Sequence, residues 1–169
     1  MPITGMPLLF GLLAFAWYMH LLPSSVYFYG NPHLLHLSIL FISVDFIQFA
    51  LHFAFHKKIF GLYVYGAHNI HHKVKDPTPK DAFSTGFLDS IIQLILPIYL
   101  GILFVEPNRT TVILFGLLYS QWLLYIHSDW SELSRYLVSP KYHKKHHQNL
   151  EINFAHVLPL WDHLLNTTA

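Results

Sequence analysis

Residues 33–56 read HLLHLSILFISVDFIQFALHFAFH, and this stretch combines the two features that decide the fold. Its first part, residues 33–51, is almost wholly apolar and long enough to cross a bilayer, which needs about 20 such residues in a helix. It ends in His52-Phe53-Ala54-Phe55-His56, where a spacing of four places both imidazoles on one helix face. The stretch therefore predicts a membrane helix with potential metal ligands at one end.

Three further apolar stretches, residues 6–22, 86–105 and 111–126, are also long enough for membrane helices. Turn residues separate the four stretches at positions 23, 30–32 and 106–108. The first stretch could instead be a signal peptide, but no Lys or Arg precedes its apolar part and no small-residue cleavage pattern follows it. We therefore expect an all-α fold, a single membrane domain over residues 1–169 with about four transmembrane helices.

The composition supports a membrane protein and limits the chemistry. Of the 169 residues, 53% are hydrophobic and only 11% are charged, which is unusual for a soluble domain of this size. The net charge of +1 gives no reason to expect a nucleic-acid partner. Because the chain has no cysteine, thiolate catalysis and thiolate metal sites are excluded, and the 14 histidines become the candidate ligands.

The placement of charge predicts an orientation. Nine of the ten Lys and Arg residues lie in residues 57–80 or after His127, and only Arg109 lies on the opposite side. The positive-inside rule then places both basic segments and both termini in the cytoplasm.

Two more histidine boxes lie on the side predicted to be cytoplasmic. Both have the pattern HxxHH: His68-Asn69-Ile70-His71-His72 and His143-Lys144-Lys145-His146-His147. The first, fourth and fifth positions are neighbours in a helix, so we expect three imidazoles to converge from each turn. A chain this rich in histidine contains one such motif by chance only about a tenth of the time, so two copies are a strong signal. The predicted metal ligands are His52, His56, His68, His71, His72, His127, His143, His146 and His147.

Nine imidazoles are too many for one ion, whose coordination number is at most about six, so they predict two metal ions. Imidazole suits zinc, copper, iron and nickel alike, so the ligand type does not choose the metal. We expect His20, His33, His36 and His163 to be surface or structural residues, and His156 stays open as a further ligand.

Asp45 lies on the helix face of His52, two turns earlier. A carboxylate inside a membrane must face the bundle interior and find a partner. We expect it to accept a hydrogen bond from the non-ligating nitrogen of His52 or another histidine, which would fix that ring's tautomer. The alternative is a structural hydrogen bond between helices.

At these residues the chain resembles the fatty acid hydroxylase and sterol desaturase superfamily, which includes sterol C-5 desaturases, C-4 methyl sterol oxidases, fatty acid 2-hydroxylases and carotenoid hydroxylases. The resemblance covers about residues 45–167 and rests on Asp45, the boxes HFAFH, HNIHH and HKKHH, the isolated His127, Asn153-Phe154-Ala155 and Trp161-Asp162. The chain departs from the family pattern at Phe53, where Arg is common, at Ser131, where some relatives have a histidine, and at Leu165-Asn166, where many have Phe-Gly.

The resemblance implies a non-haem centre of two iron ions, with O2 as co-substrate. Such a centre removes hydrogen from an unactivated C–H bond of a membrane lipid, a sterol or a fatty acyl chain, and leaves a hydroxyl group or a double bond. We take Asp45, Asn153 and Asp162 as candidates for residues that support the metal ligands.

Each turnover also needs electrons from elsewhere. The chain has no haem-attachment motif, GxGxxG motif or P-loop, so we expect an external donor, either cytochrome b5 with its reductase or a ferredoxin. The expected location is the endoplasmic reticulum membrane in a eukaryote or the inner membrane in a bacterium.

Two other functions stay open. The first is a transition-metal transporter or a haem-binding electron carrier, although transporters often carry looser histidine tracts and bis-histidine haem needs ligands within the membrane helices. The second is an inactive relative that only binds lipid, although the intact boxes argue against it. The boxes distinguish neither hydroxylation from desaturation nor one lipid substrate from another.

Overall fold

The computed structural model describes residues 5–59 and 61–169, and every regular element within them is helical. The all-α prediction is therefore confirmed for this part of the chain. The elements in order are α1 (Gly5–Tyr18), η1 (Ser24–Tyr27), α2 (Leu34–His56), α3 (Leu62–Asn69), η2 (His71–Lys73), η3 (Pro79–Asp81), α4 (Phe87–Asp89), η4 (Ser90–Ile95), α5 (Leu96–Val105), α6 (Arg109–Ile126), α7 (Pro140–Gln148) and α8 (Leu160–Leu165). Of these, η4 is a π-helix, and η1, η2 and η3 are 3-10 helices.

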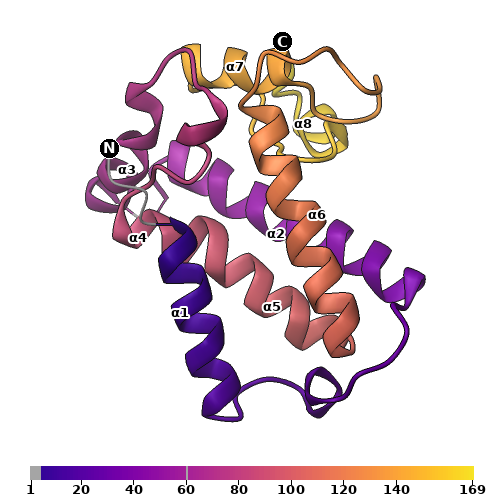
Figure 1. The fold of residues 1–169 in the computed structure, drawn as a ribbon. Coiled ribbons are helices and arrows are strands. Elements are labelled where there is room, and N and C mark those ends of the chain that lie inside the picture. Colours follow the sequence, from indigo (N-terminus) through magenta and orange to yellow (C-terminus); the bar gives the residue numbers. More distant parts are fainter. Residues whose placement is uncertain (1–4, 60) are drawn as a thin grey trace.

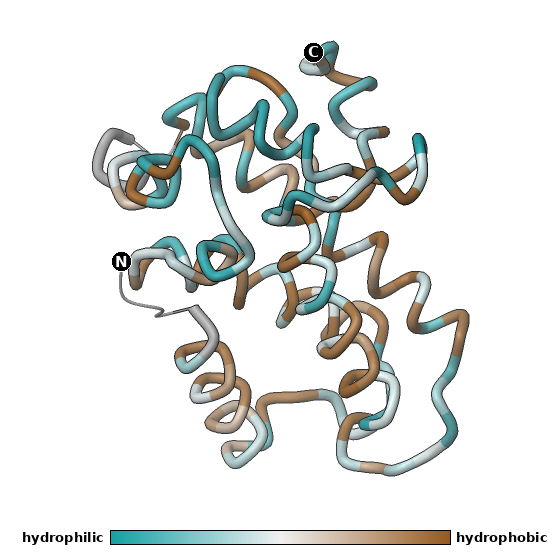
Figure 2. The backbone as a smooth tube through the Cα atoms, turned by 45° about the horizontal axis from the view of Figure 1, so that its top comes forward, coloured by the Kyte–Doolittle hydropathy of each residue, from teal (hydrophilic) through white to brown (hydrophobic). Residues whose placement is uncertain are grey.

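The long helices α1, α2, α5 and α6 form a body, and the shorter helices α3, α7 and α8 gather at one end of it (Figure 1). Helix α2 packs against α5 and α6, and α1 packs against η4. Figure 2 shows that the residues of the body are mainly hydrophobic, whereas hydrophilic residues are concentrated at the end that holds the short helices. The four apolar stretches of the sequence thus separate from the histidine boxes in space.

Two helical segments, Leu34–His56 and Phe87–Val105, are long and apolar enough to cross a membrane. Helix α1 is apolar but shorter. The body also exposes large apolar side chains such as Phe15, Phe104 and Leu117, as expected of a surface that faces lipid. These observations support membrane association, and the crossing of all four predicted helices stays a prediction.

The body is closely packed where α2 meets α5. A Cβ atom at Gly101 would lie 2.7 Å from Val44 Cγ2 and 3.1 Å from Leu40 Cδ1, so only glycine allows this approach. Leu40 and Val44 are both fully buried at the contact. This contact fixes the position of α2, the helix that ends in the HxxxH box.

The turns predicted between the apolar stretches lie next to each other at the start of α6. Asn108 caps α6 by accepting from the Thr111 backbone N–H at 2.9 Å, and its Nδ2 donates to the Asn31 carbonyl at 2.9 Å. The Arg109 guanidinium donates to the Tyr27 carbonyl at 2.6 Å. The other end of α6 leads through His127 toward α7 and the histidine boxes (Figure 1).

Candidate metal centre

All nine predicted ligands lie together at the end of α2, on α3 and η2, just after α6 and on α7. Eight of them form two buried groups whose ring nitrogens lie within 4.8 Å of one another: His52, His56, His72 and His146 in one, and His71, His127, His143 and His147 in the other. His68 joins the first group, since its Nε2 lies 3.1 Å from His56 Nε2 and 2.8 Å from His72 Nε2. We call the group of five cluster 1 and the group of four cluster 2.

Each HxxHH box divides its histidines between the two clusters. The outer pair of the first HxxHH box, His68 and His72, enters cluster 1, and His71 enters cluster 2. The second HxxHH box does the reverse, since His146 enters cluster 1 and the outer pair enters cluster 2. The expectation that three imidazoles converge from one turn is therefore wrong. The first and fifth residues of the box are four apart and point in nearly the same direction from a helix. The fourth residue points about 100° away from the fifth, toward the neighbouring cluster.

The nitrogen spacings in cluster 1 fit a single ion. His52 Nε2 lies 3.1 Å from His56 Nε2 and 3.0 Å from His146 Nε2, and His56 Nε2 lies 3.2 Å from His72 Nε2. Two nitrogens bound at right angles to one ion, each about 2.1 Å from it, would lie about 3.0 Å apart. Cluster 1 is therefore dense enough for an ion with five or six ligands.

Five rings are oriented by hydrogen bonds from the nitrogen that points away from the cluster. His68 Nδ1 donates to Asp89 at 2.8 Å. The other four donate to backbone carbonyls: His52 to Phe154, His127 to Leu123, His146 to Ile152 and His147 to Val74, at 2.6–2.8 Å. A carbonyl can only accept, so Nδ1 carries the hydrogen in these rings and Nε2 carries a lone pair.

This tautomer assignment brings two lone pairs together. The Nε2 atoms of His52 and His146 lie 3.0 Å apart, and both rings donate through Nδ1 to carbonyls. Neither neutral ring has a hydrogen to share with the other, so this contact is repulsive unless a cation binds both nitrogens. The donor set of cluster 1 therefore fits a metal ion.

Five buried rings outside the candidate membrane spans are held in their neutral form. Burial, followed by neighbouring histidines, lowers the pKa of His72, His143 and His146 well below the usual 6.5. Burial also lowers the pKa of His127 to about 3 and that of His156 to about 3. Metal binding requires neutral imidazole, so these rings are ready to act as ligands at neutral pH.

Among the described residues Asp45 accepts no hydrogen bond from a histidine ring, so the predicted hydrogen bond from His52 or another histidine is wrong. Its carboxylate accepts from the backbone N–H groups of Val157 at 2.9 Å and Leu158 at 3.0 Å, and from Trp161 Nε1 at 2.8 Å. Two helical turns separate Asp45 from His52, about 10 Å along the axis, which is too far for the carboxylate to reach the ring. Asp45 instead fixes the C-terminal segment against α2.

Asp162 and Asn153 shape the same segment. Asp162 accepts from the backbone N–H groups of Phe154 at 2.9 Å and Ala155 at 2.7 Å, and from the Tyr142 hydroxyl at 2.8 Å. Asn153 has a left-handed φ of 60°, and its Nδ2 donates to the Tyr142 carbonyl at 3.1 Å. Because residues 152 and 154 supply the carbonyls that orient His146 and His52, both side chains support cluster 1 through the backbone.

The sequence analysis did not identify Asp89, whose carboxylate contacts the predicted ligand His68 directly. Its carboxylate accepts from His68, and the two side chains are almost completely buried. The rule that singled out Asp45, a carboxylate within an apolar stretch, applies equally to Asp89 in residues 86–105.

The fatty acid hydroxylase family matches residues 37–167, which is most of the chain. The chain belongs to the fatty acid hydroxylase family. The resemblance inferred from the boxes is therefore confirmed, and membership supports a lipid oxygenase role. No solved structure matches the chain.

A curated relative of this family member is the alternative squalene epoxidase of Phaeodactylum tricornutum (strain CCAP 1055/1). The two are 31% identical over 171 residues, which cover 96% of this chain and 49% of the relative. The chain thus spans about half the length of that protein.

The remaining histidines of this family member lie outside the two groups of four. His20, His33 and His163 are exposed, and His36 is half-buried. His156 is different, because it is buried and its ring centroid lies 4.7 Å from that of His52 and 5.5 Å from that of His143. Its role as a ligand stays open.

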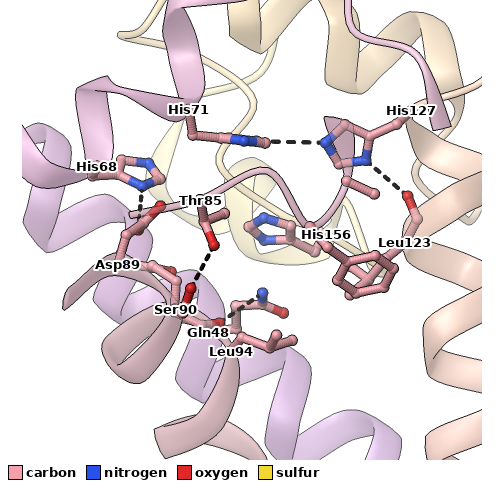
Figure 3. Close-up of a pocket in the computed structure, with 13 residues that line it drawn as sticks. Gln48, His68, His71, Thr85, Asp89, Ser90, Leu94, Leu123, His127 and His156 are labelled. Atoms are coloured by element: carbon pink, nitrogen blue, oxygen red, sulfur yellow. Dashed lines mark hydrogen bonds and ion pairs between the residues drawn. The ribbon is translucent and has the colours of Figure 1, made fainter. Parts of the chain in front are cut away.

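A cavity of about 50 Å³ adjoins both clusters. His68, His71, His127 and His156 line one side of it (Figure 3), and Gln93, Leu94 and Leu123 are among its other walls. A larger apolar groove of about 390 Å³ shares Phe83, Leu94 and Leu123 with this cavity. The arrangement offers an apolar molecule a place beside the histidines.

Proposed function

We propose that the chain is a membrane-embedded oxygenase that hydroxylates or desaturates an unactivated C–H bond of a membrane lipid, a sterol or a fatty acyl chain. The reaction takes place at two iron ions, one held by cluster 1 and one by cluster 2. The observation that carries the proposal is the facing pair of lone pairs on His52 and His146, which only a cation can make favourable.

The choice of iron rests on family membership, since imidazole also suits zinc, copper and nickel. Bound iron supplies the redox chemistry that activates O2, the co-substrate. The residues of the chain direct five Nε2 atoms inward by hydrogen bonds from Nδ1 and exclude water by burial.

The substrate reaches the centre from the apolar body. The mainly apolar groove between α1, α5 and α6 can hold a hydrocarbon chain, and it shares Phe83, Leu94 and Leu123 with the cavity at His71 and His127. The name of the P. tricornutum relative adds an isoprenoid hydrocarbon to the substrates worth testing, and epoxidation to the possible reactions.

Electrons come from a separate donor, cytochrome b5 with its reductase or a ferredoxin. The chain is a multi-pass protein of the endoplasmic reticulum membrane or of a bacterial inner membrane, with the histidine boxes and both termini in the cytoplasm. The lysines around the boxes and the apolar helices at the other end support this orientation.

Lipidomics of a host that expresses the wild type or His72→Ala tests the proposal. The wild type should accumulate a lipid that is one oxygen heavier or two hydrogens lighter than a host lipid, and His72→Ala should not. His20→Ala is the matched control, because His20 is exposed and lies outside both clusters. A changed metal content of the host without any oxidised lipid would favour the transporter alternative instead.

A further inference from the structure

Gln93 is a buried amide with no role in the metal clusters. It is only 7% exposed, and neither its Nε2 nor its Oε1 has a hydrogen-bond partner in the protein. It lines the cavity of about 50 Å³ that also contacts His68, His71 and His127. A buried amide without a partner costs about 1–3 kcal/mol, so its position needs an explanation.

The backbone at Gln93 has an unusual helical form where the side chain lines the cavity. Gln93 lies in the π-helix η4, and insertions of this kind occur frequently at functional sites. The Gln93 carbonyl accepts from Gln48 Nε2 at 2.9 Å, and Gln48 Oε1 accepts in turn from the Tyr119 hydroxyl. The Gln93 carbonyl thus has a partner from α2, whereas the Gln93 side-chain amide is free to bind a polar group in the cavity.

The cavity has an apolar approach. The groove of about 390 Å³ is lined by residues such as Leu9, Leu13, Ile98 and Phe115, and it meets the cavity at Phe83, Leu94 and Leu123. An extended hydrocarbon can lie in the groove while its end, or one polar group, enters the cavity. Gln93 then contacts the part of the molecule nearest the histidines.

We propose that the Gln93 amide binds a neutral hydroxyl group of the lipid substrate and thereby selects an oxygen-bearing lipid over a pure hydrocarbon. The amide offers a donor and an acceptor, and a hydroxyl group can pair with both. Among the described residues no Lys or Arg lines the cavity, and the carboxylate of Asp89 already accepts from His68, so no side-chain cation is present to pair with a carboxylate or phosphate headgroup. The inference rests on the proposed function, because it treats this cavity as the place where the lipid reacts.

The size of the effect follows from the unpaired amide. A hydrocarbon in the cavity leaves the Gln93 amide without a partner, whereas an alcohol satisfies it. We expect the alcohol to bind about tenfold to a hundredfold more tightly than the matching hydrocarbon.

The test compares matched probes on the purified, metal-loaded full chain in lipid nanodiscs. The probes are 5α-cholestan-3β-ol against 5α-cholestane, and octadecan-1-ol against octadecane, with dissociation constants measured by competition against a labelled alcohol. The wild type should prefer the alcohol in at least one pair. Gln93→Met, an apolar side chain of similar length, should lose that preference by weakening alcohol binding and strengthening hydrocarbon binding.

Gln148→Met is the matched control, because Gln148 is exposed at the end of α7 and lines neither the cavity nor the groove. It should keep the wild-type preference. Metal content and melting temperature establish that each variant is folded, and Gln93→Leu replaces Gln93→Met if the latter fails to fold.

Two results would overturn the inference: no preference in either pair for the wild type, or an unchanged preference in the folded Gln93 variant. If the wild type still binds two irons and oxidises lipid in that case, only the role of Gln93 is lost. Absence of bound metal in the wild type would instead remove the proposed function itself.

Discussion

Clusters 1 and 2 use the same motifs, but they differ in number and spacing of ligands. Cluster 1 has five rings with Nε2 atoms 2.8–3.2 Å apart between neighbours. Cluster 2 has four rings, and His127 Nε2 lies 3.2 Å from His143 Nε2 and 3.5 Å from His71 Nε2. An ion in cluster 1 would have most of its coordination positions filled by histidine, whereas an ion in cluster 2 would keep more positions open.

The clusters also differ in what lies next to them. His71 and His127 of cluster 2 line the cavity, but only His68 of cluster 1 does so. Cluster 1 has three rings oriented by hydrogen bonds from Nδ1, and cluster 2 has two. Under the proposed function, cluster 2 is therefore the one that O2 and the substrate reach more directly from the cavity.

The largest effects should come from removing one ligand of either cluster. His72→Ala in cluster 1 and His147→Ala in cluster 2 should each abolish lipid oxidation, because each leaves one ion with an incomplete set of ligands. Membrane insertion should be unchanged, since it depends on the apolar helices. His20→Ala should have almost no effect in the same lipid assay, and equal loss in all three variants would contradict the assignment of the boxes.

Removing the metal should loosen the histidine end before the helical body. Metal binding adds its free energy to folding, and the segments that carry most of the ligands lie outside the body. A chelator should therefore speed proteolysis at Lys73, Lys75, Lys80, Lys141, Lys144 and Lys145. Equal cleavage rates with and without chelator would show that no metal links these segments.

Acid should act in the same direction on the metal-free protein. The pKa of His127 and that of His156 are about 3 in the folded state, against about 6.5 in an unfolded chain. Below pH 6.5 the unfolded chain takes up protons that the folded chain does not, so stability falls between pH 6.5 and 3 and is fully present above that range. Unfolding followed against pH would contradict this if stability rose as the pH fell through this range.

Asp89→Asn should affect cluster 1 more than cluster 2. The substitution weakens the hydrogen bond that orients His68, and loss of such a partner typically costs on the order of 10–100-fold in metal affinity. Metal titration should then show one weakened site and one site close to wild type. Equal weakening of both sites would mean that the two clusters do not bind independently.

The smallest effect on the metal centre should come from the body. Gly101→Ala places a methyl group 2.7 Å from Val44 and should cost about 1–3 kcal/mol of folding free energy. The melting temperature should fall while the metal content per folded chain stays unchanged. A loss of metal in the folded variant would show that packing between α2 and α5 controls the site.

The sequence predicted the helices and the gathering of the histidines well, because both depend on local patterns. The apolar stretches became α1, α2, the segment Phe87–Val105 and α6, and the boxes lie together as expected. Helix α6 contains Arg109, Ser120 and Gln121 and is less apolar than the two helical segments that could cross a membrane.

The predictions were wrong where tertiary packing determines which residues contact each other. A helical wheel places Asp45 on the face of His52 but says nothing of the distance along the axis or of the C-terminal segment that Asp45 binds. The spacing of HxxHH explains why the fourth position leaves the outer pair, but which cluster each position enters depends on how α3 and α7 are packed. No pattern in the sequence predicts the π-helix at Gln93.

The metal content of the purified full chain, measured by mass spectrometry of the elements, tests the two-cluster assignment most directly. We predict two iron ions per folded wild-type chain, and at most one in His146→Ala, which removes a ligand of cluster 1. Wild-type protein with no bound metal, or with a metal content that His146→Ala leaves unchanged, would contradict it.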